Sequence, residues 1–156
     1  MTPTADGTFH GVGRVPIYWQ RYDATPGPPR AVILLSHGYA EHVGRYGEFI
    51  AHCTRRGLAV VGLDHRGHGR SGGPRGHCRD FDDLVADLRQ LNDLAASWWP
   101  KTPRLLFGHS LGGLIALAYA ARRPREIRAV AVSSPALRLA HPTDPVTAFV
   151  VTNVAK

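Results

Sequence analysis

The sequence predicts an α/β fold, a mostly parallel sheet with helices on both faces. Continuous apolar runs such as 31–35 and 58–63 are typical of strands that are buried on both faces of a sheet. Amphipathic helical stretches alternate with these runs, and this alternation is the pattern of a parallel sheet. The chain has 156 residues, of which 44% are hydrophobic and 20% charged, so it is most simply one domain with a sizeable core.

Each expected element has its own local signal. Weak alternation from Thr8 to Asp23 predicts a hairpin or two edge strands. Apolar residues three and four positions apart predict helices, whose ends coincide with Gly57, Asp80 or Pro124. The strands are expected at 31–35, 58–63, 104–107 and 127–133, and the helices at 45–56, 80–98 and 114–121.

Charge and cysteine content narrow the function classes. The net charge is +7, but the basic residues are scattered and form no stripe with interleaved aromatics, so we expect no nucleic-acid partner. Cys53, on an apolar helix face, and Cys78, in a Gly-rich loop, are typical of reduced thiols. We see neither a signal peptide nor an apolar run of the ~20 residues that span a bilayer. The expected location is cytoplasmic, with peripheral membrane contact as the alternative.

The most informative motif is Gly108-His109-Ser110-Leu111-Gly112, which lies directly between an expected strand and an expected helix. A turn of this kind is a nucleophile elbow, which presents a serine hydroxyl at the edge of a sheet. The serine backbone is strained there, and the positions two before and two after it have no room for a Cβ. Ser110 is therefore the candidate nucleophile, and Gly108 and Gly112 are the candidate supports of the turn.

Acyl transfer by a serine also needs an oxyanion hole, usually two backbone N–H groups. One is expected from the residue after the serine, Leu111, and the other from the loop after the strand at 31–35. In that loop Gly38 lets the backbone turn inward, so the amide of Tyr39 is the candidate, and its side chain is not needed. His37 is expected to support the loop by hydrogen bonds.

Other patterns in the chain are less favoured. Asp64 precedes the serine, whereas in such a fold the acid follows it, so we expect Asp64 to fix its own loop by hydrogen bonds. The stretch 67–72 matches a dinucleotide fingerprint, but the next helix begins only near Asp80, too late to bind a pyrophosphate. We therefore expect no cofactor and no metal. No compact zinc pattern matches the spacing of the possible metal ligands in the loop, which are His65, His68, His77 and Cys78.

Four short motifs follow one another along the chain, at 37–42, 44–46, 64–71 and 108–113. Together they resemble the monoacylglycerol lipase and lysophospholipase family of α/β-hydrolases, with its serine aminopeptidase-like hydrolase domain. The similarity runs from about residue 8 to residue 139. The resemblance implies the α/β-hydrolase fold, the nucleophile and oxyanion hole named above, and a mobile lid. It also implies a small-molecule lipid ester as the partner.

The catalytic acid and histidine that this chemistry requires have no suitable candidates. After Ser110 the chain offers only one histidine, His141, and one aspartate, Asp144, in reversed order and too early. We therefore expect the N-terminal part of a longer enzyme, truncated before the last strands of the sheet. Residues 1–139 would belong to the hydrolase core, and 140–156 would begin the lid, through which transient membrane contact is expected.

The favoured function is a serine ester hydrolase that acts on a monoacylglycerol or a lysophospholipid through an acyl-enzyme at Ser110. A carboxylesterase or an aminopeptidase on the same fold would use the same serine and is the first alternative. A truncated relic or binding module that keeps the elbow without activating it is the alternative from a different class. An aspartate and a histidine encoded downstream would discriminate against that alternative.

Overall fold

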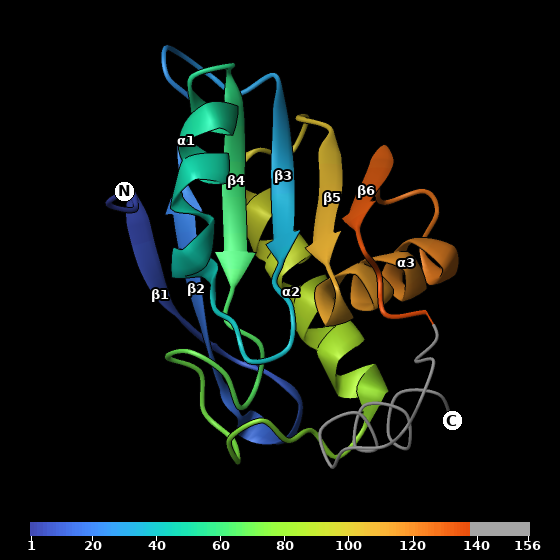
Figure 1. Cartoon of the computed structure of the whole chain (residues 1–156). Coiled ribbons are helices and arrows are strands. Elements are labelled where there is room, and N and C mark those ends of the chain that lie inside the picture. The colour runs from blue at the N-terminus through green and yellow to red at the C-terminus, as the bar shows by residue number, and fades with distance from the viewer. Residues whose placement is uncertain (138–156) are drawn as a thin grey trace.

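The computed structural model describes residues 1–137, which form a six-stranded sheet flanked by helices (Figure 1). Two short 3-10 helices, η1 and η2, precede β2 and α1 in the described part of the chain. The strands are β1 (Ala5–His10), β2 (Pro16–Tyr22), β3 (Ala31–Ser36), β4 (Leu58–Leu63), β5 (Arg104–His109) and β6 (Ala129–Ser133). The helices are η1 (Val12–Arg14), η2 (Val43–Tyr46), α1 (Gly47–Thr54), α2 (Phe81–Trp98) and α3 (Leu111–Arg122).

The strands lie across the sheet in the order β1-β2-β4-β3-β5-β6. β4, β3, β5 and β6 run parallel, whereas the β1–β2 hairpin joins β4 through antiparallel pairing, with Trp19 opposite Leu63. The prediction of a mostly parallel sheet is therefore confirmed. Of the two possibilities for the N-terminal segment, the hairpin is observed. Its first strand, β1, is an edge strand, whereas β2 lies between β1 and β4.

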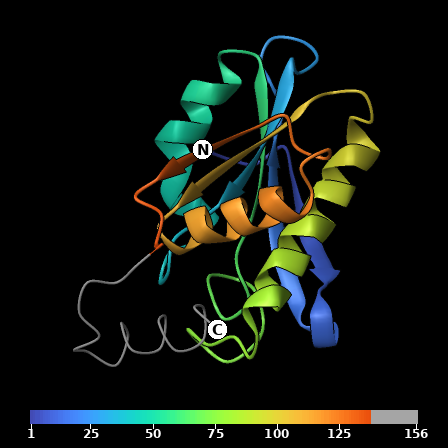
Figure 2. The same cartoon turned by 90° about the vertical axis from the view of Figure 1, so that its right-hand side faces the viewer.

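Helices cover both faces of the sheet, with α1 on one face and α2 and α3 on the other (Figure 2). The larger core lies under α2 and α3 and includes Leu34, Leu88 and Ile115, while the smaller core lies under α1 and includes Leu35 and Ile50. Leu34 and Leu35 are neighbours on β3, and successive strand side chains point to opposite faces. The continuous apolar run of β3 follows from this burial on both faces.

α2 agrees closely with its sequence pattern. Asp80 caps the N-terminus, because its carboxylate accepts a hydrogen bond from the Asp82 N–H at 2.9 Å. The apolar face packs into the larger core, and Phe81 and Trp98 at its two ends are partly buried. The buried apolar residues of the helix are Leu84, Val85, Leu88, Leu91 and Ala95.

Two elements are shorter than the sequence predicts. The helix expected at 45–56 is divided into η2 and α1, because the Tyr46 backbone leaves the helical region (φ −95°, ψ 19°). The strand expected from 127 begins at Ala129. It is the last strand of the described sheet, and most of its residues are exposed.

The expected lid segment, 140–156, lies outside the described residues, as do His141 and Asp144. In the part of the chain that the structure describes, no helix is both long enough and apolar enough to cross a membrane. Both cysteines are buried free thiols, Cys53 in the smaller core and Cys78 in the larger one.

Candidate active site

The predicted motifs meet at the carboxyl ends of three parallel strands, which lie at the bottom of the sheet in Figure 1. β3 lies between β4 and β5. The loops that begin at His37, Asp64 and Ser110 therefore start next to one another. In open α/β sheets, ligands bind at the carboxyl ends of the strands.

Ser110 occupies a sharp turn between β5 and α3. Its backbone has φ 51° and ψ −117°, and L-residues rarely adopt a positive φ. Hydrogen bonds hold the turn: the Ser110 N–H donates to the Ser133 carbonyl at 3.0 Å, and the Ser110 carbonyl accepts from the Gly113 N–H at 3.0 Å. A strained serine between a strand and a helix has the geometry of a nucleophile elbow.

Both glycines of the motif are required by close approaches of the backbone. A Cβ on Gly108 would overlap the Gly112 carbonyl and come within 2.7 Å of the Gly113 Cα. A Cβ on Gly112 would overlap the carbonyl oxygens of Ser36 and His37 at the end of β3. Neither position therefore has room for a side chain in this structure. Gly112 also lets α3 approach the turn after β3, which the sequence did not indicate.

Of the two expected oxyanion-hole residues, Leu111 lies in the elbow itself and Tyr39 lies in the turn after β3. Leu111 is the first residue of α3, so its N–H has no acceptor within the helix. The turn after β3 packs against the end of β5, because a Cβ on Gly38 would lie 3.2 Å from the His109 Cδ2. The Gly38 N–H donates to Glu41 Oε2 at 3.0 Å and is thus already used. The turn that contains Tyr39 is brought next to the elbow.

Two side chains hold the turn after β3. Glu41 Oε2 also accepts from the Tyr46 hydroxyl at 2.7 Å. Burial acts to raise the pKa of Glu41, but its hydrogen bonds with Tyr46 and Gly38 outweigh burial and lower it. His37 Nδ1 donates to the Gly38 carbonyl at 2.7 Å, and its Nε2 accepts from the His65 N–H at 2.9 Å. Both ring nitrogens of His37 are therefore engaged in hydrogen bonds to the backbone of these loops.

The side chain of Tyr39 crosses to the Gly-rich loop between β4 and α2. Its hydroxyl donates to the Gly76 carbonyl at 3.2 Å, and its ring lies edge-on to His68, with centroids 5.3 Å apart. Gly76 has φ 65°, and a Cβ there would come within 2.7 Å of the Tyr39 hydroxyl. The Tyr39 side chain therefore links the turn after β3 to the Gly-rich loop, a contact that the sequence did not indicate.

Comparison with known proteins identifies the family. A family model described as "Serine aminopeptidase, S33" matches residues 27–156. The chain belongs to this family. It is 46% identical over 143 residues to the monoacylglycerol lipase of Mycolicibacterium smegmatis, covering 91% of this chain and 50% of that protein. It is 41% identical over 127 residues to the human monoglyceride lipase, covering 81% of this chain and 42% of that protein.

A solved structure supports the same assignment. The monoacylglycerol lipase of Paleococcus ferrophilus is similar with a TM-score of 0.73 and 32% sequence identity, covering 90% of this chain and 51% of that one. The α/β-hydrolase fold and the family resemblance are therefore confirmed. The chain spans about half the length of the curated relatives that it matches.

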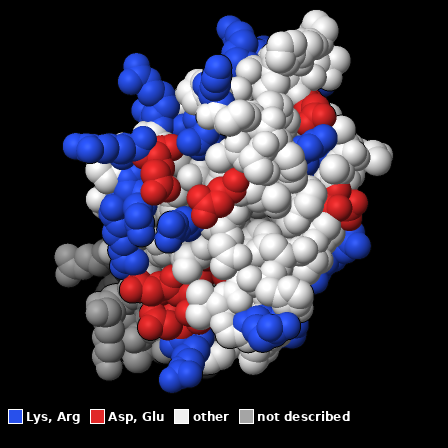
Figure 3. Space-filling model, turned by 180° about the vertical axis from the view of Figure 1, so that it is seen from behind, with Lys and Arg blue, Asp and Glu red and all other residues white. Residues whose placement is uncertain are grey.

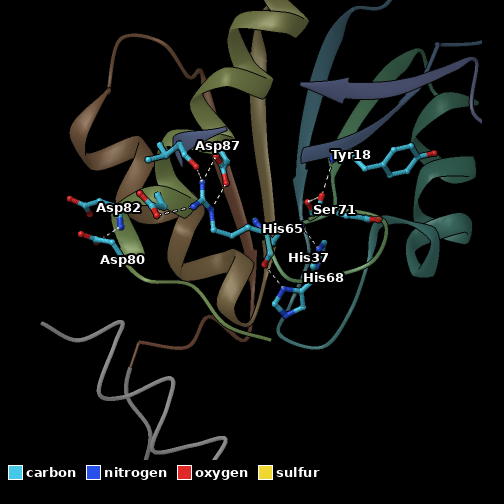
Figure 4. A network of polar contacts seen from close by, with 12 residues as sticks. Tyr18, His37, His65, His68, Ser71, Asp80, Asp82 and Asp87 are labelled. Atoms are coloured by element: carbon cyan, nitrogen blue, oxygen red, sulfur yellow. Dashed lines mark hydrogen bonds and ion pairs between the residues drawn. The ribbon is translucent and has the colours of Figure 1, made fainter. Parts of the chain in front are cut away.

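In this member of the serine aminopeptidase family, three buried histidines gather at the ends of β3 and β4 (Figure 4). The ring centroid of His37 lies 4.5 Å from that of His65 and 5.6 Å from that of His68. His65 Nε2 is 2.9 Å from the Ser36 hydroxyl, and His68 Nδ1 donates to the Arg66 carbonyl at 3.0 Å. Burial lowers the pKa of all three imidazoles, that of His37 to about 4, so they are neutral at neutral pH.

We expect the free energy of unfolding to fall as the pH is lowered from about 6.5 towards 4. The unfolded chain has imidazoles of pKa about 6.5, so in this range it binds more protons than the folded chain, and stability rises with pH. Urea unfolding across this range measures the slope. His68→Gln should make the slope shallower, whereas His52→Gln, which removes an exposed imidazole on α1, is the matched control. A stability that does not depend on pH over this range would contradict the prediction.

The other patterns in the sequence have structural explanations. Asp64 fixes two loops, because its carboxylate accepts from the Val43 N–H and the Arg70 N–H, each at 2.8 Å. α2 begins at Phe81, so no helix N-terminus follows directly on 67–72. Among the described residues, no group of three or more His, Cys, Asp or Glu side chains is placed to hold a metal ion.

The sequence analysis missed a buried ion-pair network around Arg66. The guanidinium binds both carboxylate oxygens of Asp87, at 2.8 Å and 2.9 Å, and one oxygen of Asp83 at 2.8 Å. It also donates to the Val12 carbonyl at 3.3 Å. Asp87 is fully buried, and burial raises its pKa although Arg66 acts to lower it. The network fastens the Gly-rich loop between β4 and α2 to α2 itself and to η1.

One member of this network, Asp87, could have been recognised from the sequence pattern. Asp87 lies three residues after Leu84 and four before Leu91, so it occupies the apolar face of α2. A charged residue on such a face indicates a buried partner. The partner, Arg66, lies in a loop 21 residues away, and no local pattern connects the two.

Proposed function

We propose that the protein containing this chain hydrolyses the single ester bond of a monoacylglycerol or a lysophospholipid through a covalent acyl-enzyme. The observation that carries the proposal is the strained turn at Ser110, with the turn after β3 packed beside it. The Ser110 hydroxyl attacks the ester carbonyl as its proton passes to a general base, and the alcohol leaves with that proton when the ester C–O bond breaks. Water then attacks the acyl-enzyme, which releases the fatty acid and restores the Ser110 hydroxyl. The backbone N–H groups of Leu111 and Tyr39 stabilise the negative charge that develops on the carbonyl oxygen.

The serine also needs a general base and an acid that orients it. The histidines next to the elbow have other contacts: both ring nitrogens of His37 are used, and His109 Nδ1 donates to the Ser133 carbonyl at 3.1 Å. In this fold the acid and the histidine follow the serine in chain order. We assign both to residues outside the described part of the chain, in keeping with the greater length of the relatives.

The names of the relatives support an acylglycerol as the first substrate to test. The M. smegmatis and human proteins are named for monoacylglycerol and monoglyceride hydrolysis. A glycerol ester with one acyl chain is soluble only at low concentration. We therefore also propose peripheral contact with a membrane surface, made through the segment at 140–156.

The decisive experiment is fluorophosphonate labelling of the complete polypeptide, followed by mass spectrometry of its peptides. A fluorophosphonate forms a bond only with an activated serine, so we expect a single adduct, on the peptide that contains Ser110. The absence of an adduct would favour the non-catalytic alternative. An adduct on another serine would overturn the assignment of the nucleophile.

Substrate comparison then separates the enzyme alternatives. Turnover of monooleoylglycerol, lysophosphatidylcholine, p-nitrophenyl butyrate and proline p-nitroanilide is measured with the same preparation. We expect the highest kcat/KM for one of the two lipids, by about tenfold or more over the aryl ester, because a long acyl chain adds transition-state binding. The highest value for the aryl ester would indicate a carboxylesterase, and for the proline anilide an aminopeptidase.

A further inference from the structure

A second concave site lies at the amino ends of the parallel strands, whereas Ser110 lies at their carboxyl ends. The loop before β5, at 100–104, and the loop before β6, at 124–128, border an open pocket of about 540 Å³. Pockets of roughly 300–1,000 Å³ are typical of small-molecule sites. The amino ends of β5 and β6 border this pocket, so it is separated from the candidate active site by the length of the strands.

The pocket is strongly positive. Within residues 1–137, none of its four cations forms an ion pair with a carboxylate, and the Arg104 Nε has no hydrogen-bond partner. Seen from behind, Lys and Arg side chains gather at the upper left, towards the amino ends of these strands (Figure 3). The four cations are Lys101, Arg104, Arg125 and Arg128.

The one carboxylate in the lining, that of Glu126, offsets only one of these four charges, and its oxygens also have other partners. Glu126 Oε2 accepts from the Tyr119 hydroxyl at 2.5 Å, and Glu126 Oε1 lies 3.8 Å from the Arg123 guanidinium. Asn92 donates to the same carboxylate at 3.4 Å. The pocket therefore keeps an excess of positive charge.

The loops that carry the cations are held in place. Their backbones are tied to the sheet, since the Arg128 N–H donates to the Arg104 carbonyl at 2.8 Å and the Val32 N–H to the Pro103 carbonyl at 2.9 Å. Pro100, Pro103 and Pro124 further restrict these segments, because the proline ring fixes φ. A fixed backbone loses less entropy on binding than a mobile one, although the side chains of Lys101, Arg125 and Arg128 are exposed.

We propose that this pocket binds a ligand that carries two or more adjacent phosphate groups. Arginine is the residue best suited to phosphate oxygens, because its planar guanidinium donates two parallel hydrogen bonds. The lining has no aromatic side chain on which a base could stack, which disfavours single-stranded nucleic acid. The proposal does not depend on the activity of Ser110.

The test is titration calorimetry of the complete polypeptide with inorganic pyrophosphate at low and high salt. We expect binding at a single site that weakens as the salt concentration rises. Arg125→Gln combined with Arg128→Gln should weaken it by about tenfold or more, because two charge-assisted contacts are lost. The matched control is Arg14→Gln combined with Arg55→Gln, which removes the same charge from exposed sites elsewhere.

A second arm asks whether the phosphates belong to a lipid. Cosedimentation with vesicles of phosphatidylcholine and cardiolipin, whose headgroup carries two phosphates, is measured for both double variants. Binding that the pocket variant loses and the control keeps would support the site with a lipid headgroup as the phosphate source. Equal behaviour of the two variants in both arms, or no binding in either arm, would overturn the proposal. Thermal unfolding without ligand verifies that both variants are folded.

Discussion

Ser110→Ala is expected to lower kcat of the complete enzyme by about ten-thousandfold or more. The substitution removes the oxygen that forms the bond with the acyl carbon, while leaving the oxyanion-hole amides in place. The free energy of unfolding should change little, because alanine meets the same positive φ of 51° that serine does. The loss would therefore be one of chemistry and not of folding.

The measurement is the steady-state rate on monooleoylglycerol, together with fluorophosphonate labelling of the same protein. Ser133→Ala is the matched control. Ser133 also lies at the carboxyl end of a parallel strand, β6, and its side chain is exposed. Its backbone carbonyl, which the substitution keeps, accepts from the Ser110 N–H at 3.0 Å. Its hydroxyl lies 3.3 Å from His109 Nδ1, but that nitrogen also donates to the retained Ser133 carbonyl, so this variant should keep both activity and label. Turnover that survives in Ser110→Ala would exclude Ser110 as the nucleophile.

The fold was predictable where local pattern and tertiary environment agree. The apolar run of β3 is continuous because Leu34 and Leu35 pack into opposite cores, and the α2 stripe faces a single core. The helix expected at 45–56 was too long because the backbone leaves the helical region at Tyr46. Tyr46 hydrogen-bonds to Glu41, and this contact with the turn after β3 accompanies the break between η2 and α1.

In the candidate site, too, the local motif could be predicted from the sequence, whereas the contacts between loops could not. The elbow is contiguous in sequence, so Gly108, Ser110 and Gly112 could be identified from spacing alone. Contacts between loops could not, because each partner is visible in the sequence but the pairing is not. The Tyr39 hydroxyl meets the Gly76 carbonyl across 37 residues, and its hydrogen bond depends on how two loops pack.

Arg66→Met is expected to lower the free energy of unfolding by about 3–5 kcal/mol, because it leaves the carboxylate of Asp87 buried without its cation. Urea unfolding at neutral pH measures the loss. Arg89→Met is the matched control, an arginine on α2, the helix that carries Asp87. Arg89 lies 4.0 Å from Asp93, both side chains are more than half exposed, and such pairs contribute about 0–1 kcal/mol. Equal losses in the two variants would contradict the argument from burial.

Two further measurements distinguish loss of the cation from loss of packing. Adding Asp87→Leu to Arg66→Met should restore much of the stability, because a buried ion pair costs nearly as much in desolvation as it gains in attraction. The deficit of the single variant should also shrink as the pH falls. Burial raises the pKa of Asp87, and without Arg66 the folded chain would take up this proton at a higher pH than the unfolded chain. A deficit that stays constant with pH, and that the second substitution does not reduce, would indicate that Arg66 acts through packing alone.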